Sequence, residues 1–197
     1  MRSSITRRVG GQQAPDGERR ELRGALLAAR RAIPEAERRR LDAAIARRLV
    51  DWLSEREPGV VGLWWPLAGE PDARPVFGEL IDAGWTIALP RVSAPGQPLA
   101  FGLWRPGIGM AEEAHRVMVP APFELVAPSL IVAPCVGFDP RGWRLGYGGG
   151  YYDRTLAALD VPAAGAAYDR CEVVLEPEAH DRRLQAIFTE SRLLRCG

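Results

Sequence analysis

The stretch RLGYGGGYYDR, residues 144–154, concentrates residue types that can bind an anion. It holds four glycines and three of the chain's four tyrosines, together with Arg144, Asp153 and Arg154. A glycine-rich turn between a strand and a helix lets bare N–H groups approach a phosphate, and the helix dipole adds attraction. The stretch therefore predicts a phosphate-binding loop. A strand-to-helix turn with no ligand is the alternative.

This loop matches neither standard phosphate motif. The P-loop pattern G-x-x-x-x-G-K-[ST] is absent, and the dinucleotide fingerprint would need a glycine at Tyr151. Asp153 falls in the first turn of the following helix, where it could complement the dipole or bind magnesium. Tyr151 and Tyr152 could pack, or could donate a hydroxyl or stack on a flat ring.

Alternating helices and strands must position the loop. Leu22, Leu26 and Ala29 indicate a helix from Glu18, and Pro34 opens a second helix that ends at Pro58-Gly59. Strands alternating with helices imply an α/β three-layer fold with a mainly parallel sheet, in which ligands bind beyond the carboxyl ends of the strands. Further helices are expected over 73–83 and to about Leu159, and strands over 60–65, 86–89, 99–104, 130–133, 163–168, 187–189 and 193–194.

Length and composition limit the alternatives. A chain of 197 residues suits one domain, here 18–197, after a polar segment 1–17 that is expected to be a disordered tail. A net charge of +1 gives no reason to expect nucleic-acid or membrane binding, and neither a membrane span nor a secretory signal is visible. Three cysteines without metal-ligand spacing indicate reduced thiols in a cytoplasmic protein. All 26 basic residues counted as Lys or Arg are arginine.

The block APCVGFDPRGWRLGYGGGYYDR, residues 133–154, resembles the signature of the 5-formyltetrahydrofolate cyclo-ligase family, also called methenyltetrahydrofolate synthetases. Weaker matches lie on either side in the expected order, so the resemblance covers most of the chain from Glu18 to Leu194. They are Arg19 and Leu22-Arg23, WPLAGEPDARP, LPRV at 89–92, AAYD at 166–169, EAHD at 178–181 and FTE at 188–190.

The resemblance implies an ATP- and Mg²⁺-dependent conversion of 5-formyltetrahydrofolate to 5,10-methenyltetrahydrofolate with release of ADP and phosphate. It also implies a fold similar to that of ribose-phosphate isomerases and CoA transferases. The γ-phosphate would pass to the formyl oxygen, N10 would attack the formyl carbon, and phosphate would leave as the ring closes. Such phosphoryl transfer needs positioning and charge neutralisation more than covalent help. We expect 5-formyltetrahydrofolate and ATP as the ligands of a monomer.

The resemblance also implies residue roles. Arg144 and Tyr152 would be catalytic, and Asp153 and Asp181 would hold magnesium. Glu70, Trp65 and Tyr152 would contact the folate, although at least one of Trp64 and Trp65 is expected in the core. The ATP-binding residues would be Arg19, Arg23, Arg144, Leu145, Gly146, Tyr147, Gly148, Gly149, Gly150, Tyr151 and Tyr152. Without the resemblance, Arg19 and Arg23 would be interpreted as a solvated helix face and Asp181 as a loop carboxylate.

Three positions depart from the family pattern. Arginine stands at Arg19 where lysine is common, which keeps the charge but binds phosphate through a fork. Ala73 replaces a threonine and Cys171 replaces a glutamine, both on the expected folate side. We expect Cys171 to pack and not to act as a nucleophile. We expect His115 to lie at the surface.

Two other functions remain open at this point. One is a non-catalytic nucleotide- or phosphate-binding regulatory protein on the same scaffold, against which the intact pair of Asp153 and Asp181 argues. The other is an RNA-associated protein that uses the arginine-rich helices at 19–48, whose interleaved acidic residues weaken any basic stripe. Dependence of ATP turnover on 5-formyltetrahydrofolate would separate all three.

Overall fold

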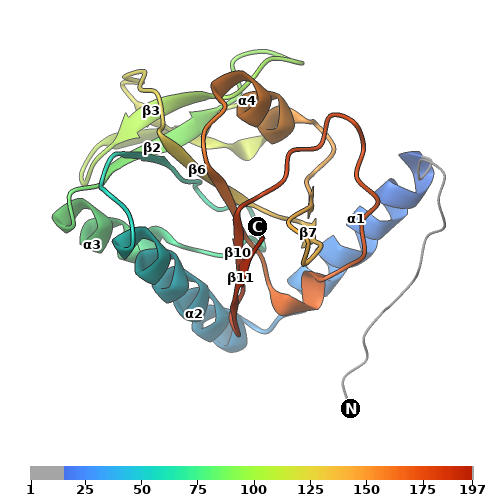
Figure 1. Cartoon of the computed structure of the whole chain (residues 1–197). Coiled ribbons are helices and arrows are strands. Elements are labelled where there is room, and N and C mark those ends of the chain that lie inside the picture. The colour runs from blue at the N-terminus through green and yellow to red at the C-terminus, as the bar shows by residue number, and fades with distance from the viewer. Residues whose placement is uncertain (1–15, 197) are drawn as a thin grey trace.

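The computed structural model describes residues 16–196 and contains a central seven-stranded sheet (Figure 1). Its strand order is β11-β10-β9-β6-β1-β2-β3. The five inner strands run parallel, and the two edge strands β11 and β3 run antiparallel to their neighbours, which confirms the predicted mainly parallel sheet. The strands are β1 (Val60–Gly62), β2 (Thr86–Arg91), β3 (Ala100–Trp104), β6 (Leu130–Pro134), β9 (Ala163–Ala166), β10 (Ala186–Phe188) and β11 (Leu193–Arg195).

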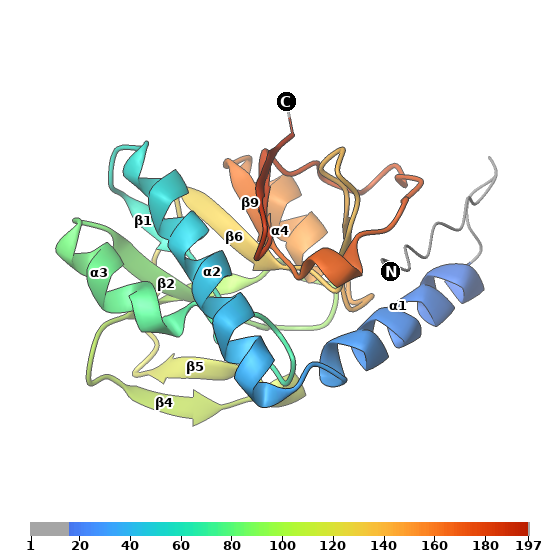
Figure 2. The ribbon, with the colours of Figure 1, turned by 90° about the horizontal axis from the view of Figure 1, so that it is seen from below.

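Helices cover both faces of this sheet. α2 (Glu35–Ser54) and α3 (Phe77–Asp82) lie on one face, and α4 (Tyr151–Leu159) lies on the other (Figures 1 and 2). α1 (Asp16–Arg31) extends away from the end of α2 along one side of the molecule (Figure 2). Three short 3-10 turns complete the helical segments: η1 (Arg74–Val76), η2 (Ala114–Arg116) and η3 (Asp169–Cys171).

The core lies in two layers because successive strand side chains point to opposite faces. Val61, Ile87 and Val132 pack with buried residues of α1 and α2. Their chain neighbours Ala88 and Ile131 face the other way and pack with a cluster that includes a side chain of α4. Strands buried on both faces have continuous apolar runs, which explains the absence of alternation in the sequence.

Several elements differ from the predictions. Two hairpins were not predicted: β4 (Gly109–Glu112) with β5 (Met118–Ala121), and β7 (Gly137–Phe138) with β8 (Arg144–Leu145). The second hairpin means that β8, and not the preceding sheet strand, leads into the glycine loop. The strand predicted over 60–65 ends at Gly62, because the chain leaves the sheet there to form a loop.

The chain ends and long helices complete the description. α1 begins at Asp16, so the last two residues of the predicted tail 1–17 are helical and the rest of that tail lies outside the described residues. Within residues 16–196, none of the helices has the length and apolar character that a membrane crossing would require.

Candidate active site

Two of the predicted site segments, the loop with Glu70 and the glycine loop, follow the neighbouring parallel strands β1 and β6. The chain leaving β1 goes on to β2 on one side of this pair, and the chain leaving β6 goes on to β9 on the other side. The two connections diverge beyond the carboxyl ends of this pair, which is where open α/β sheets bind ligands. Glu70 follows β1, and Cys135 follows β6 directly. The expected location of the site at the carboxyl ends is therefore matched by the topology.

The glycine loop connects β8 to α4 and uses backbone that favours glycine. Gly148 has φ +98° and Gly150, at the N-terminal cap of α4, has φ +65°, whereas the φ of Gly149 is not positive. Non-glycine residues in the left-handed region cost about 1–2 kcal/mol each. Tyr147, Gly148 and Gly149 are exposed. The loop therefore presents bare backbone to solvent at the start of a nine-residue helix.

Three guanidinium groups lie directly against this loop. A Cβ at Gly146 would stand 3.1 Å from Nη1 of Arg144, and a Cβ at Gly150 would stand 2.7 Å from Nη1 of Arg154. A Cβ at Gly148 would stand 3.3 Å from Cζ of Arg23. Larger residues at these positions would displace the arginines, so the glycines allow positive charge to lie against exposed backbone. This is the chemistry of an anion site.

Arg144 and Asp153 form a partly buried ion pair beside the loop. Nη2 of Arg144 donates to Oδ1 of Asp153 at 2.6 Å, and their side chains are 3% and 16% exposed. Within residues 16–196 the buried Nε of Arg144 has no hydrogen-bond partner, which is costly unless a ligand supplies an acceptor. The guanidinium also lies 5.4 Å from the ring centroid of Tyr152. Burial raises the pKa of the Tyr152 hydroxyl, so this group stays protonated as a donor.

The two arginines of α1 take different partners. Nε of Arg23 donates to the carbonyl of Gly146 at 3.0 Å and thereby braces the glycine loop. Nη2 of Arg19 donates to the carbonyl of Glu176 at 2.7 Å and to Oδ2 of Asp181 at 2.9 Å. The interpretation of both residues as a solvated helix face is wrong, because Arg19 is buried and Arg23 is partly buried.

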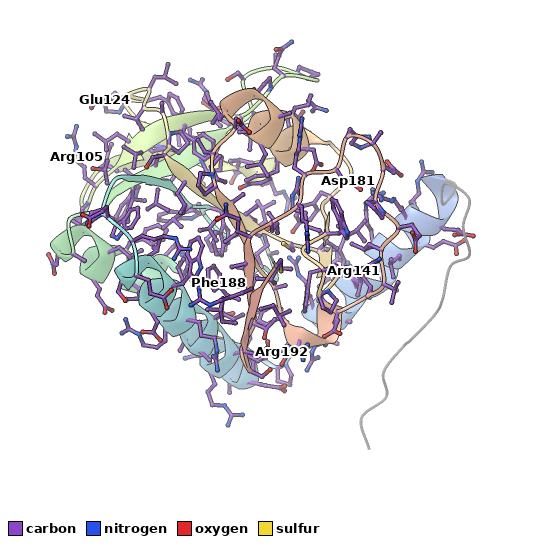
Figure 3. The ribbon with its side chains drawn as sticks, viewed as in Figure 1. Arg105, Glu124, Arg141, Asp181, Phe188 and Arg192 are labelled. Carbon is purple, nitrogen blue, oxygen red and sulfur yellow. The ribbon has the colours of Figure 1, made fainter. Side chains whose placement is uncertain are left out.

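Asp181 lies in the segment between η3 and β10 (Figure 3). Together with Glu178 and His180 it offers ligand atoms within 4.8 Å of one another, a group that could hold a metal ion. Asp153 belongs to a different element, and its described hydrogen bond engages Oδ1 alone, so Oδ2 is left for a hard cation. Both predicted ligands are thus carboxylates of the kind that magnesium prefers, and each is already held by an arginine.

Glu70, in the loop after β1, and Tyr147, in the glycine loop, interact with each other. Glu70 is 5% exposed, and its Oε2 accepts a hydrogen bond from the N–H of Leu67 at 2.8 Å. Burial raises the pKa of this carboxyl, against hydrogen bonds from Leu67 and Tyr147 and the positive charge of Arg30, which lower it. Burial likewise raises the pKa of the Tyr147 hydroxyl.

Of the two tryptophans, Trp64 is a core residue and Trp65 is not. Trp64 is 2% exposed and its indole Nε1 donates to the carbonyl of Pro71 at 3.0 Å. Trp65 is partly exposed, and the guanidinium of Arg74 lies 4.7 Å from its ring centroid. The prediction that at least one of them is core is confirmed, and Trp65 remains the one available to a flat ligand ring.

The remaining predicted positions behave as packing or surface residues. Ala73 and Cys171 are fully buried, and burial raises the pKa of the Cys171 thiol to about 11, which agrees with a packing role. His115 is exposed, as expected. The sequence analysis missed Arg30, which is 1% exposed and bonds to three separate segments of the candidate site. Its spacing to Arg19 and Arg23, at eleven and seven residues, places it on their face of α1 and could have identified it.

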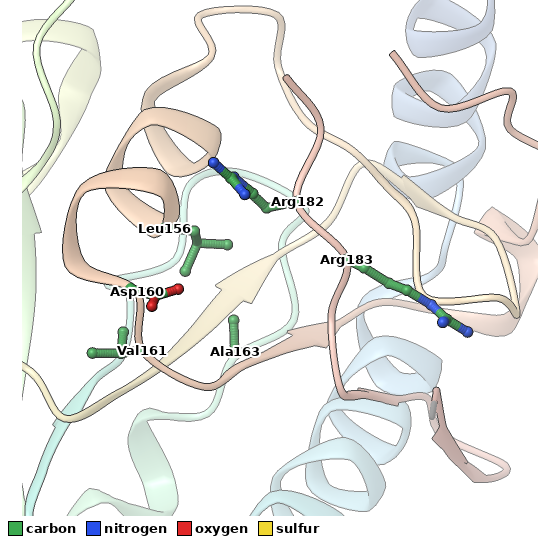
Figure 4. Close-up of a pocket in the computed structure, with 6 residues that line it drawn as sticks. All are labelled: Leu156, Asp160, Val161, Ala163, Arg182 and Arg183. Carbon is green, nitrogen blue, oxygen red and sulfur yellow. The ribbon is translucent and has the colours of Figure 1, made fainter. Parts of the chain in front are cut away.

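A second hollow lies at the opposite end of α4 from the glycine loop (Figure 4). Its volume is about 230 Å³, and Arg182 points toward α4 while Arg183 points away. None of the predicted site residues lines it. Its lining residues are Leu156, Asp160, Val161, Ala163, Arg182 and Arg183.

Comparisons with known proteins agree with the geometry. The sequence profile of the 5-formyltetrahydrofolate cyclo-ligase family matches residues 15–190. A 5-formyltetrahydrofolate cyclo-ligase of Mycolicibacterium smegmatis is 33% identical over 185 residues, which cover 87% of this chain and 93% of the relative. The enzyme of the same name from Escherichia coli is 27% identical over 175 residues, covering 83% and 96%.

Solved structures show the same fold. The NMR structure of Aquifex aeolicus 5,10-methenyltetrahydrofolate synthetase superposes with a TM-score of 0.79 at 30% identity, covering 90% of this chain and 92% of that one. A 5,10-methenyltetrahydrofolate synthetase from Mycoplasma pneumoniae gives a TM-score of 0.74 at 23% identity, covering 88% and 99%, which bears on the fold alone. The family resemblance of residues 133–154 is therefore confirmed, and the chain belongs to the 5-formyltetrahydrofolate cyclo-ligase family.

Proposed function

We propose that the protein converts 5-formyltetrahydrofolate to 5,10-methenyltetrahydrofolate, with ATP as co-substrate and release of ADP and phosphate. Family membership supports the reaction. One observation of the structure carries the ATP half: three guanidinium groups lie within 3.4 Å of where Cβ atoms would stand on a glycine loop of exposed backbone. A loop built in this way suits the phosphates of a nucleotide.

The phosphate side of the site comprises the loop Leu145–Tyr152 with Arg19, Arg23 and Arg144. The loop amides and the start of α4 bind phosphate oxygens, and Arg144 donates its orphaned Nε to the transferring group. In this arrangement Arg19 and Arg144 exchange carboxylate or carbonyl partners for phosphate oxygens, whereas Arg23 keeps its bond to the carbonyl of Gly146. Preorganised donors of this kind act where negative charge develops in the transition state.

Magnesium would be held by Asp153 and Asp181. When bound, magnesium would neutralise phosphate charge. The residues fit this group because both ligands are carboxylates, each held by an arginine of the proposed phosphate side, and Asp153 keeps Oδ2 outside its bond to Arg144. The arginine partners hold the two carboxylates in place before the ion arrives.

Ring closure needs a formyl carbon that is activated and correctly placed. Phosphorylation of the formyl oxygen makes that oxygen a leaving group, N10 forms the new bond to carbon, and phosphate departs with the oxygen. Tyr152, protonated and beneath Arg144, is placed to contact both the formyl group and the phosphate. Glu70 binds N–H groups of the folate and Trp65 stacks on its ring. The catalytic roles thus fall on Arg144 and Tyr152.

The deciding experiment is ATP turnover measured with and without 5-formyltetrahydrofolate, with formation of the methenyl product followed by its absorbance. We expect ADP and methenyl product in equal amounts, both dependent on magnesium. ATP binding with no folate-dependent turnover would instead support the regulatory nucleotide-binding protein. We propose a cytoplasmic monomer without a nucleic-acid partner, and RNA binding through the arginines of α1 and α2 would contradict that part.

A further inference from the structure

Arg30, in the last turn of α1, is the most buried arginine of the candidate site. The proposed function gives it no role in phosphate binding. Its Nε donates to the carbonyl of Gly69 at 2.7 Å, and its Nη2 donates to the hydroxyl of Tyr147 at 3.0 Å. Its Nη1 lies 3.4 Å from the carbonyl of Cys135. One guanidinium therefore ties together the loop after β1, the end of β6 and the glycine loop.

Two of these contacts lie beside Glu70, which the proposed function assigns to the folate. Gly69 directly precedes Glu70 and has φ +81°, so its carbonyl direction is fixed by a backbone that only glycine adopts freely. Tyr147 receives the bond from Arg30 on its oxygen, which leaves its own proton for Glu70. Arg30 thus determines where both polar groups of the folate side lie.

Charge gives Arg30 a second effect on Glu70. The ionisable groups facing this carboxyl are Arg30 from α1, Tyr147 from the glycine loop and Tyr152 from α4. Arg30 is the cation among them within residues 16–196. Since burial disfavours the carboxylate, the nearby positive charge opposes that effect and favours ionisation.

We propose that Arg30 is a positioning residue for the folate: it holds the carbonyls of Gly69 and Cys135 and the hydroxyl of Tyr147 in one arrangement. Glu70, which directly follows Gly69, is thereby placed to bind the N–H groups of the substrate. This inference rests on the proposed function. Arg30 itself touches no substrate and acts through Glu70 and Tyr147. The inner face of α1 then serves both substrates, with Arg19 and Arg23 toward ATP and Arg30 toward the folate. Arg19 and Arg30 are about 16 Å apart along the helix axis.

The test is the pH dependence of kcat/KM for 5-formyltetrahydrofolate in the parent, Arg30→Met and Arg30→Lys. In Arg30→Met the acid limb should move upward by about 1–2 pH units, since an opposite charge nearby lowers a carboxyl pKa by that order. Arg30→Lys keeps the charge but cannot hold three acceptors, so its acid limb should stay in place while KM for the folate rises tenfold or more. The exposed neighbour variant Arg31→Met is the control and should match the parent in both.

Each outcome decides one part of the inference. An acid limb in Arg30→Met that coincides with the parent's would overturn the effect on Glu70, and a parental folate KM in Arg30→Lys would overturn the positioning role. If Arg30→Met does not fold, the lysine variant carries both questions, because a shifted limb there would show that charge alone is not what Arg30 supplies. Failure of the proposed function looks different: the parent itself would show no folate-dependent turnover.

Discussion

Replacing Gly148 by alanine tests whether the loop's backbone geometry serves ATP. The residue has φ +98°, where an L side chain is strained, and the new Cβ would lie 3.3 Å from Cζ of Arg23. Backbone strain of this type costs about 1–2 kcal/mol. For a chain of 197 residues this corresponds to a fall in Tm of roughly 2–8 °C.

The effect on ATP should exceed this strain, because Arg23 must move. Its hydrogen bond to the carbonyl of Gly146, at 3.0 Å, braces the loop. A bond from a charged donor contributes about 1.5–3 kcal/mol, so its loss should weaken ATP binding by roughly 10- to 100-fold. Folate affinity measured without ATP should change little, since Arg23 has no contact with Glu70 among the described residues.

The assays are isothermal titration calorimetry for ATP and for the folate, together with thermal and urea denaturation. Gly78→Ala is the control for the sign of the stability change, because a Cβ there meets nothing within 4 Å. This helical position should become more stable by about 0.5–1 kcal/mol. If Gly148→Ala melts earlier while binding ATP with parental affinity, the glycines form only a structural turn and the phosphate-loop reasoning is refuted.

Three further predictions concern Asp153, Asp139 and the cysteines. Asp153→Asn keeps an acceptor for Arg144, so this variant should fold normally yet need far more magnesium for turnover. If Asp153 only complemented the helix dipole, the substitution would lower the free energy of unfolding by about 0.3–1 kcal/mol and the magnesium titrations of variant and parent would superimpose. Burial alone would raise the pKa of Asp139, but bonds from Arg141 and Leu175 outweigh it and lower that pKa. The carboxylate of Asp139 therefore stabilises the fold at neutral pH, and this stabilisation is lost in acid. The free energy of unfolding of Asp139→Asn, measured by denaturation, should be lower than the parent's by roughly 1.5–3 kcal/mol at pH 7 and should converge with it below about pH 4. A difference that stays constant with pH would contradict this. Burial raises the pKa of Cys135 to about 12 and of Cys171 to about 11, so iodoacetamide should leave both unlabelled in the native protein at pH 8, and mass spectrometry showing rapid labelling would refute it.

The sequence predicted the elements whose residues carry a local signal. The glycine loop, the apolar strands and the amphipathic helices depend on neighbours in the chain, and most of their bounds agree with the structure to within a few residues. The start of α4 at Tyr151 follows directly from the glycines before it. The hairpin of β4 and β5 has no clear alternation of apolar and polar residues and was missed for that reason.

What the sequence could not show are pairings over long distances. The ion pair of Arg144 and Asp153 is a short-range contrast: the two residues are nine apart, and their pairing could have been inferred from the helix that follows the loop. The bonds from Arg30 to Gly69, Cys135 and Tyr147 span 39 to 117 residues, and although helical spacing places Arg30 on the face of Arg19 and Arg23, it does not show these partners. The predicted roles of individual site residues stay predictions until the variants above are measured.

The hydrogen bonds of α1 to the segment around Asp181 can form only late in synthesis of the chain. Arg19 and Asp181 are 162 residues apart, and ribosomes add about 5–20 residues per second, so the first helix waits roughly 10–30 s for that partner. During this interval the nascent chain already contains Arg19 and Arg23 but not the segment that holds Arg19 in place. A chain released before Asp181 is added would therefore leave α1 without that anchor.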